Sequence, residues 1–140
     1  MLTEKDYCDY ETCVALKELG FRERCVAYYD TADNVGLLYN TQWTCDVIPC
    51  QYCDLLESRN SATEYEVDAP TLYDAQKWLR ENHNLHVEVS YNPFLSWYVY
   101  RVWEHQDEIA EGEAFPTYED ALSTAIYMAT EFLKEKNNGN

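Results

Sequence analysis

The feature that most constrains this chain is a long amphipathic segment near its C-terminus, from Thr117 to about Lys134. If Tyr118 is the first residue of a helix, a turn of about 100° per residue places nine apolar side chains on one stripe. The stripe contains Tyr118, Ala121, Leu122, Ala125, Ile126, Met128, Ala129, Phe132 and Leu133. Thr117 with Asp120 three residues later is a near capping box. Such a face needs a partner surface, and we expect a sheet built from upstream strands.

The upstream sequence predicts two more helices and several strands. The helices span residues 9–20, which Asp9 caps and Gly20 ends, and residues 72–82, which Thr71 caps. The strands span residues 25–30, 37–40, 64–67, 86–91 and 97–103, with one further rung at 114–115. Residues 104–112 are expected to form an acidic loop, and residues 41–63 an irregular loop that contains three cysteines.

These elements predict a single α+β domain over residues 1–140. It consists of an antiparallel β-sheet of hairpins, with three helices packed mainly on one face. Residues 10–40 and 72–103 share an order of helix, strand, turn and strand. This similarity has two readings, a duplication or the common chemistry of helix caps and hairpins.

The charge of the chain excludes several classes of partner. Ten Lys and Arg residues against 26 Asp and Glu residues give a net charge of −16. Eight acids and no Lys or Arg lie between Arg101 and Lys134. A chain with this charge repels phosphates, so we expect neither direct nucleic-acid binding nor binding to an anionic membrane. The simplest explanation of the charge is that it keeps the protein soluble. The functional explanation is that it attracts a basic protein partner.

The sequence also predicts the cellular compartment. No run approaches the roughly 20 apolar residues of a membrane span, and the first six residues lack the pattern of a signal peptide. A cytoplasmic setting follows, and with it reduced rather than disulfide-bonded cysteines.

Three cysteines in the irregular loop have spacing that suits a metal. Cys50 and Cys53 form a Cys-x2-Cys pair, and Cys45 offers a third thiolate for zinc. No second Cys-x2-Cys pair exists, so the fourth ligand has to come from elsewhere. The alternatives are ordinary reduced thiols that pack as small apolar groups and, less favoured because of the adjacent Asp54, redox chemistry by the pair.

The strand at 97–103 is the candidate interaction surface. Its alternation places Trp97 and Trp103 on one face and Tyr98 and Tyr100 on the other. One face has to pack under the helices, and the other is expected to show its rings to a protein partner. Cross-strand aromatic pairing is the structural alternative. No catalytic triad, phosphate-binding loop or metalloprotease helix is present in the sequence, so we predict that the chain is not an enzyme.

Three segments carry a resemblance to a known group of proteins. They are Tyr10-Glu-Thr-Cys-Val-Ala-Leu-Lys-Glu-Leu-Gly-Phe21, Ala69-Pro-Thr-Leu-Tyr-Asp-Ala-Gln-Lys-Trp-Leu-Arg-Glu-Asn-His-Asn-Leu-His86 and Tyr118-Glu-Asp-Ala121. Together they resemble small uncharacterised proteins of prophages and mobile elements of Bacteroides-type gut bacteria. The resemblance covers most of the chain outside residues 41–63, where length and content depart from it. It implies a bacterial or phage cytoplasmic setting and carries over no functional residues.

From these observations we predict a non-enzymatic accessory protein that acts through protein–protein contacts, with an unidentified partner or as a homodimer. The first alternative is an acidic mimic of DNA that inhibits a nucleic-acid-binding protein. It is motivated by the charge and by the mobile-element resemblance. The second alternative is a small zinc-stabilised binding module that uses Cys45, Cys50 and Cys53.

Overall fold

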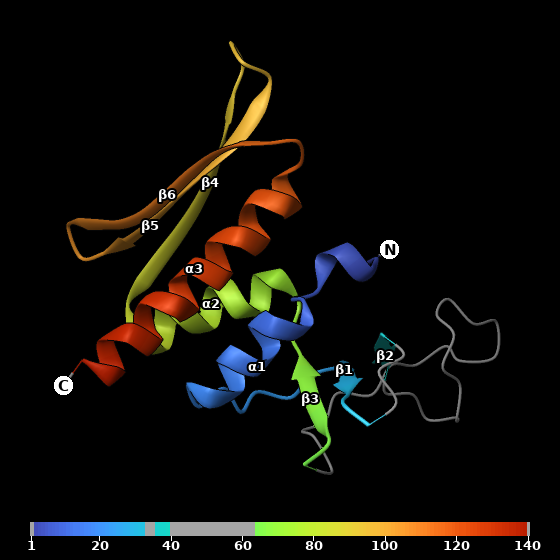
Figure 1. Cartoon of the computed structure of the whole chain (residues 1–140). Helices are drawn as coiled ribbons and strands as arrows, with labels where there is room; N and C mark the ends of the chain where they lie inside the picture. The colour runs from blue at the N-terminus through green and yellow to red at the C-terminus, as the bar shows by residue number, and fades with distance from the viewer. Residues whose placement is uncertain (1, 33–35, 40–63, 140) are drawn as a thin grey trace.

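The computed structural model describes residues 2–32, 36–39 and 64–139 (Figure 1). The helices are a short 3-10 turn η1 (Glu4–Asp6), α1 (Tyr10–Glu18), α2 (Leu72–His83) and α3 (Tyr118–Asn138). The strands are β1 (Ala27–Asp30), β2 (Leu37–Tyr39), β3 (Glu66–Ala69), β4 (Leu85–Asn92), β5 (Trp97–Glu104) and β6 (Asp107–Phe115). The predicted α+β class is confirmed. None of the helices in these ranges is both long and apolar enough to cross a lipid bilayer.

Helix α3 follows the predicted stripe closely. Thr117 caps it by accepting a hydrogen bond from the backbone N–H of Asp120 at 3.1 Å. Six of the nine stripe residues are buried, namely Ala121, Leu122, Ala125, Ile126, Ala129 and Leu133. Met128 is exposed instead, and Thr130 is buried because its hydroxyl donates to the Tyr127 carbonyl at 2.6 Å. The helix also extends to Asn138, beyond the predicted end near Lys134.

The other two helices begin where their caps were predicted. Asp9 accepts a hydrogen bond from the Thr12 N–H at 2.9 Å, and Thr71 accepts one from the Asp74 N–H at 3.1 Å. Helix α2 ends at His83, and its C-cap Asn84 adopts the left-handed conformation with φ of 54°. A polar side chain at this position tolerates that conformation better than most non-glycine residues.

The strands form two sheets rather than the single sheet expected. One has the order β2-β1-β3 and the other the order β4-β5-β6, and all pairings are antiparallel. Helix α3 packs against β4, β5 and β6 and also against α1, which in turn packs against β3. In Figure 1 α1 and α3 therefore lie between the two sheets. Strand β3 pairs with the edge of β1 and not with a strand of the second sheet.

Strand β6 corrects the prediction of an acidic loop at residues 104–112. It pairs with β5 through Tyr98↔Phe115, Tyr100↔Gly112 and Val102↔Ala110, with two register shifts on the way. The strand is hard to recognise because small residues, Ala110 and Gly112, stand opposite the buried β5 residues. The register shifts also disrupt the period of two that identifies a strand.

Candidate interaction surface

The turn between β4 and β5 has a well-defined hydrogen-bonded structure. The side-chain oxygen of Asn92 accepts hydrogen bonds from the backbone N–H groups of Phe94 at 3.0 Å and Leu95 at 3.3 Å. The Ser96 N–H donates to the Asn92 carbonyl at 2.9 Å, and Ser96 adopts a positive φ of 56°. Asn at the first position of a turn often binds its own backbone in this way. The turn therefore holds Phe94 and Leu95 in one arrangement.

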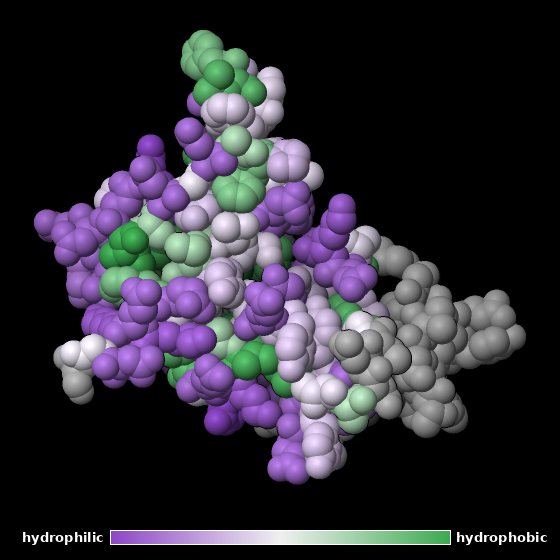
Figure 2. All heavy atoms as spheres, viewed as in Figure 1, coloured by the Kyte–Doolittle hydropathy of each residue, from purple (hydrophilic) through white to green (hydrophobic). Residues whose placement is uncertain are grey.

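This turn presents apolar side chains to solvent. Phe94 is 94% exposed, Leu95 53% and Tyr91 51%. The β4–β5 hairpin projects beyond α3 in Figure 1, and apolar residues gather at its end in Figure 2. We call Tyr91, Phe94 and Leu95 the hairpin tip. Single exposed apolar residues are ordinary, but contiguous apolar residues at the end of a projecting element are typical of contact sites.

Aromatic contacts connect the hairpin tip to the body of the protein. Tyr91 and Tyr98 are cross-strand partners with ring centroids 5.1 Å apart, and Tyr98 meets the edge of Tyr118 at 6.0 Å. Desolvation raises the pKa of Tyr118, with smaller contributions from Tyr73 and Glu119. At the other end of β5, the carboxylate of Glu104 lies 2.7 Å from the ammonium of Lys136 on α3. The strand that carries the tip is thus tied to α3 near both of its ends.

Two of the four predicted surface residues lie on the face of the sheet that α3 covers. Tyr98 is partly buried, and Tyr100 is only 5% exposed with its ring against Gly112. The prediction that Tyr100 belongs to an exposed surface is therefore wrong. The physical reason is that β5 supplies Tyr100 and Val102 to the core beneath α3.

The other two predicted residues lie on the opposite face of the sheet and are half-buried. The indole N–H of Trp103 donates to the carboxylate of Glu88 on β4 at 3.2 Å. The indole N–H of Trp97 is buried and has no hydrogen-bond partner among the described residues. Both rings are half-buried, so this face offers less open apolar surface than the hairpin tip.

Carboxylates lie beside Trp103 and Arg101 on this face of the sheet. Arg101 lies 4.0 Å from Glu108, and it is the only Lys or Arg between Arg80 and Lys134 in the sequence. A hydrogen bond with Glu111 raises the pKa of Glu108, and desolvation and repulsion from Glu111 add to this while Arg101 opposes it. Negative charge therefore outweighs positive charge around Arg101.

The predicted zinc ligands Cys45, Cys50 and Cys53 lie outside the described residues, so the zinc site stays a prediction. The cysteines that the structure does describe, Cys8, Cys13 and Cys25, are buried. Within the described ranges, no group of three or more His, Cys, Asp or Glu side chains is arranged to hold a metal ion.

The hairpin tip is the part of the surface that sequence reasoning missed. Asn92, Pro93 and Ser96 identify residues 92–96 as a turn, but a turn signal does not say how far the hairpin extends from the core. The available signal was two adjacent apolar residues, Phe94 and Leu95, inside a turn where polar residues are usual.

Comparison with other proteins adds no identification. No protein-family model, no curated protein and no solved structure matches this chain. The functional interpretation therefore depends on the geometry and chemistry described above.

Proposed function

We propose that this chain is a non-enzymatic accessory protein that acts through protein–protein contacts and that the hairpin tip is its main contact site. The observation that carries the proposal is Phe94, which a hydrogen-bonded turn holds almost fully in solvent. Burying a Phe side chain contributes roughly 1.5–3 kcal/mol. A side chain that folding leaves exposed can make that contribution in a complex.

The construction of the turn favours binding. A contact residue on a flexible loop loses conformational entropy when it binds, whereas a residue on a preorganised turn loses less. Tyr91 and Tyr98 support the tip with aromatic area that carries few rotatable bonds. Tyrosine-rich surfaces of this kind are common in binding sites for proteins.

The chemistry of the partner follows from the charge of the chain. With a net charge of −16, the chain favours a partner that surrounds an apolar pocket with Lys and Arg side chains. Two copies of the chain repel each other electrostatically, so a different, basic protein suits the surface better than a homodimer does. The proposal includes the bacterial or phage cytoplasmic setting that the resemblance implies.

A second candidate function is the acidic mimicry of DNA. It is favoured by the exposed carboxylates of Asp107, Glu108, Glu111 and Glu113, which follow one another along β6 at the edge of the sheet. It ranks second because a hydrogen bond with Glu111 and repulsion from it raise the pKa of Glu108, and a raised pKa disfavours the negative charge that mimicry of phosphate requires.

The test compares variants of the tip with a matched control. Phe94→Ser and Leu95→Ser remove apolar surface at the tip, and Leu2→Ser removes a side chain of similar exposure, 50% against 53% for Leu95, at the N-terminus. Each tagged protein is incubated with lysate of a Bacteroides-type bacterium, and captured proteins are identified by mass spectrometry. Sedimentation velocity of each purified protein measures self-association.

We expect the unmodified chain and Leu2→Ser to retain the same basic protein, and Phe94→Ser and Leu95→Ser to lose it. Equal retention by all four proteins would overturn the tip as the contact site. A protein that stays monomeric and retains nothing would overturn the function itself. Displacement of DNA from the retained protein, abolished by changing the β6 carboxylates to amides, would favour the second candidate.

A further inference from the structure

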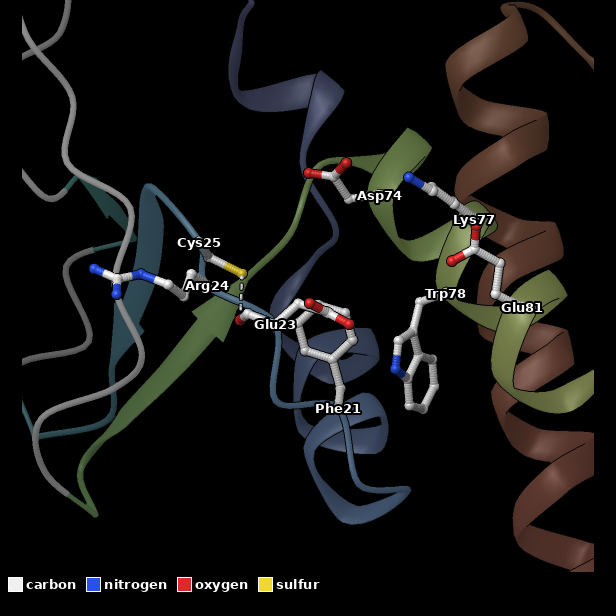
Figure 3. A pocket seen from close by; sticks show the side chains of 8 residues that line it. All are labelled: Phe21, Glu23, Arg24, Cys25, Asp74, Lys77, Trp78 and Glu81. Carbon is white, nitrogen blue, oxygen red and sulfur yellow. Dashed lines mark hydrogen bonds between the residues drawn. The ribbon is translucent and has the colours of Figure 1, made fainter.

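A pocket lies between the segment that follows α1 and one face of α2, and it shares no residue with the hairpin tip (Figure 3). Its volume is about 280 Å³. That is about nine times the volume of a water molecule in the liquid and near the lower end for small-molecule sites. Its walls come from Phe21, Glu23 and Cys25 on one side and from Asp74, Trp78 and Glu81 on the other. A molecule the size of an amino acid fits this space.

Helical spacing explains why α2 presents several groups to the same pocket. Asp74, Trp78 and Glu81 stand four and then three residues apart, so they share one face of the helix. Phe21 and Trp78 are buried, and their rings meet edge to face with centroids 5.3 Å apart. This aromatic pair forms an apolar floor beneath the carboxylates.

The pocket is electrostatically negative. It has three carboxylates, from Glu23, Asp74 and Glu81, against the single ammonium of Lys77. The guanidinium of Arg24 points away from the pocket in Figure 3. None of the three carboxylates has an ion-pair partner within the described part of the chain.

The Cys25 thiol in the pocket wall is also affected by the negative charge of the carboxylates. Burial raises the pKa of Cys25, and the carboxylates of Asp68, Asp74 and Glu23 raise it further. The thiol therefore stays protonated at neutral pH, and a protonated thiol is a poor nucleophile. The pocket is suited to binding rather than to thiol chemistry.

A hydrogen-bond donor lies in the wall of the pocket. Trp78 is only 7% exposed, and its indole N–H has no hydrogen-bond partner among the residues that the structure describes. In Figure 3 the indole nitrogen lies on the side of the ring that faces Phe21 and Glu23. A second aromatic contact, with His83 at a centroid distance of 4.8 Å, helps to fix the ring. The indole nitrogen is not fully enclosed by the protein, so its N–H can donate to an acceptor that a ligand brings.

We propose that this pocket binds a small organic cation of the guanidinium or alkylammonium class that also carries a hydrogen-bond acceptor. The carboxylates of Glu23, Asp74 and Glu81 bind the cationic end, and the indole N–H of Trp78 donates to the acceptor. Phe21 and Trp78 contact the carbon chain between the two ends. This site is independent of the hairpin tip, so the failure of either proposal leaves the other standing.

The test follows the indole N–H signals of the full-length protein by nuclear magnetic resonance during titration with L-arginine at constant ionic strength. The Trp78 signal is identified as the one absent from Trp78→Phe. L-citrulline is the matched ligand, because it has nearly the same shape as arginine but a neutral end group. Because the carboxylates of the pocket are exposed, we expect a dissociation constant on the order of a millimolar.

We expect L-arginine to shift the Trp78 signal in a saturable manner and L-citrulline to bind several-fold more weakly. Glu81→Gln and Glu23→Gln should each weaken arginine binding about two- to five-fold, since an exposed ion pair contributes little. Glu135→Gln, which changes an exposed carboxylate near the end of α3, should leave it unchanged. The proposal is overturned if arginine gives no saturable shift, if citrulline binds equally well, or if Glu135→Gln weakens binding as much as Glu81→Gln does.

Discussion

The two sheets of this protein follow the same order of elements along the chain but differ in pairing and in length. In the first sheet the first strand, β1, is central, whereas in the second sheet the middle strand, β5, is central. Strands β1 to β3 have three or four residues each, and β4 to β6 have eight or nine. The similarity between residues 10–40 and 72–103 therefore covers a helix and a hairpin but not the third strand.

The short strands contribute to the core, whereas the long strands contribute to the core and also carry an exposed surface. The short strands of the first sheet supply Ala27, Val67 and Ala69 to the core. The long strands of the second sheet supply Tyr100 and Val102 to the core and then continue past α3, where they carry the hairpin tip. The part of β4 and β5 that extends past α3 thus adds exposed surface that does not contribute to the core.

The largest expected effect concerns the core beneath α3. Ile126 is fully buried, so Ile126→Ala should lower the free energy of unfolding by roughly 2–5 kcal/mol. Leu37→Ala, at a half-buried position of the first sheet, is the matched change and should cost clearly less. Denaturant unfolding of both variants checks this, and equal costs would contradict the view that α3 organises the main core.

A smaller effect concerns the close contact between Tyr100 and β6. A β-carbon added at Gly112 would overlap the Tyr100 ring, so Gly112→Ala should destabilise the protein by about 1–3 kcal/mol. Glu113→Ala, at the next position on the strand, is exposed and serves as the control. If Gly112→Ala unfolds at the same denaturant concentration as Glu113→Ala, the pairing of Tyr100 with Gly112 is wrong.

The region around α1 and the first sheet should be sensitive to alkali. Burial raises the pKa of Cys13 well above that of a free thiol and raises the pKa of Cys25 as well. A thiol with a raised folded-state pKa stabilises the fold fully below its unfolded-state pKa. This stabilisation declines as the pH rises above the unfolded-state pKa and is lost once the pH has passed the folded-state pKa. At pH 10 the loss amounts to roughly 1–2 kcal/mol for each thiol.

Unfolding measured between pH 7 and pH 10 checks this expectation. Cys13→Ala should lower stability at pH 7 but show a shallower decline toward pH 10 than the unmodified chain. A decline of equal slope in both proteins would show that Cys13 ionises as freely in the folded chain as in the unfolded one.

The caps of the two longer helices should have nearly equal effects. Thr117→Ala and Thr71→Ala each remove an acceptor 3.1 Å from a backbone N–H, and each should cost about 1 kcal/mol. Thermal unfolding checks both variants. A negligible effect at Thr117 would mean that packing of α3, rather than its cap, determines where the helix begins.

The smallest expected effect is at the hairpin tip. Phe94→Ser should change the free energy of unfolding by less than about 0.5 kcal/mol, because the side chain contacts little of the folded chain. Denaturant unfolding beside Ile126→Ala gives the contrast directly. A cost above about 1 kcal/mol would mean that Phe94 has a structural role that its exposure does not indicate.

Much of the fold could be predicted from the sequence because local signals agree with the structure. The apolar stripe of α3 and the caps at Asp9, Thr71 and Thr117 each identify a helix without reference to the rest of the chain. The division into two sheets could not be predicted, because it depends on β3 pairing with β1 and not with a strand of the second sheet. Pairing between distant strands leaves no local pattern.

The candidate sites were less predictable for a related reason. Alternation in β5 separates Tyr100 from Trp103 correctly, but it does not say which face α3 covers. The pocket at Trp78 combines residues 21–25 with residues 74–81, which only the folded chain brings together. Strand β6 was missed because Ala110 and Gly112 at its inner positions lack the large apolar residues that mark a strand.

The most direct measurement is photo-crosslinking from the hairpin tip in living cells. A benzophenone amino acid replaces Phe94 in one protein and Leu2 in another, and both are expressed in a Bacteroides-type host and irradiated. We predict a discrete adduct with a basic protein from position 94 and none from position 2. No adduct from position 94, or the same adducts from both positions, would contradict the proposal that the hairpin tip is the contact site.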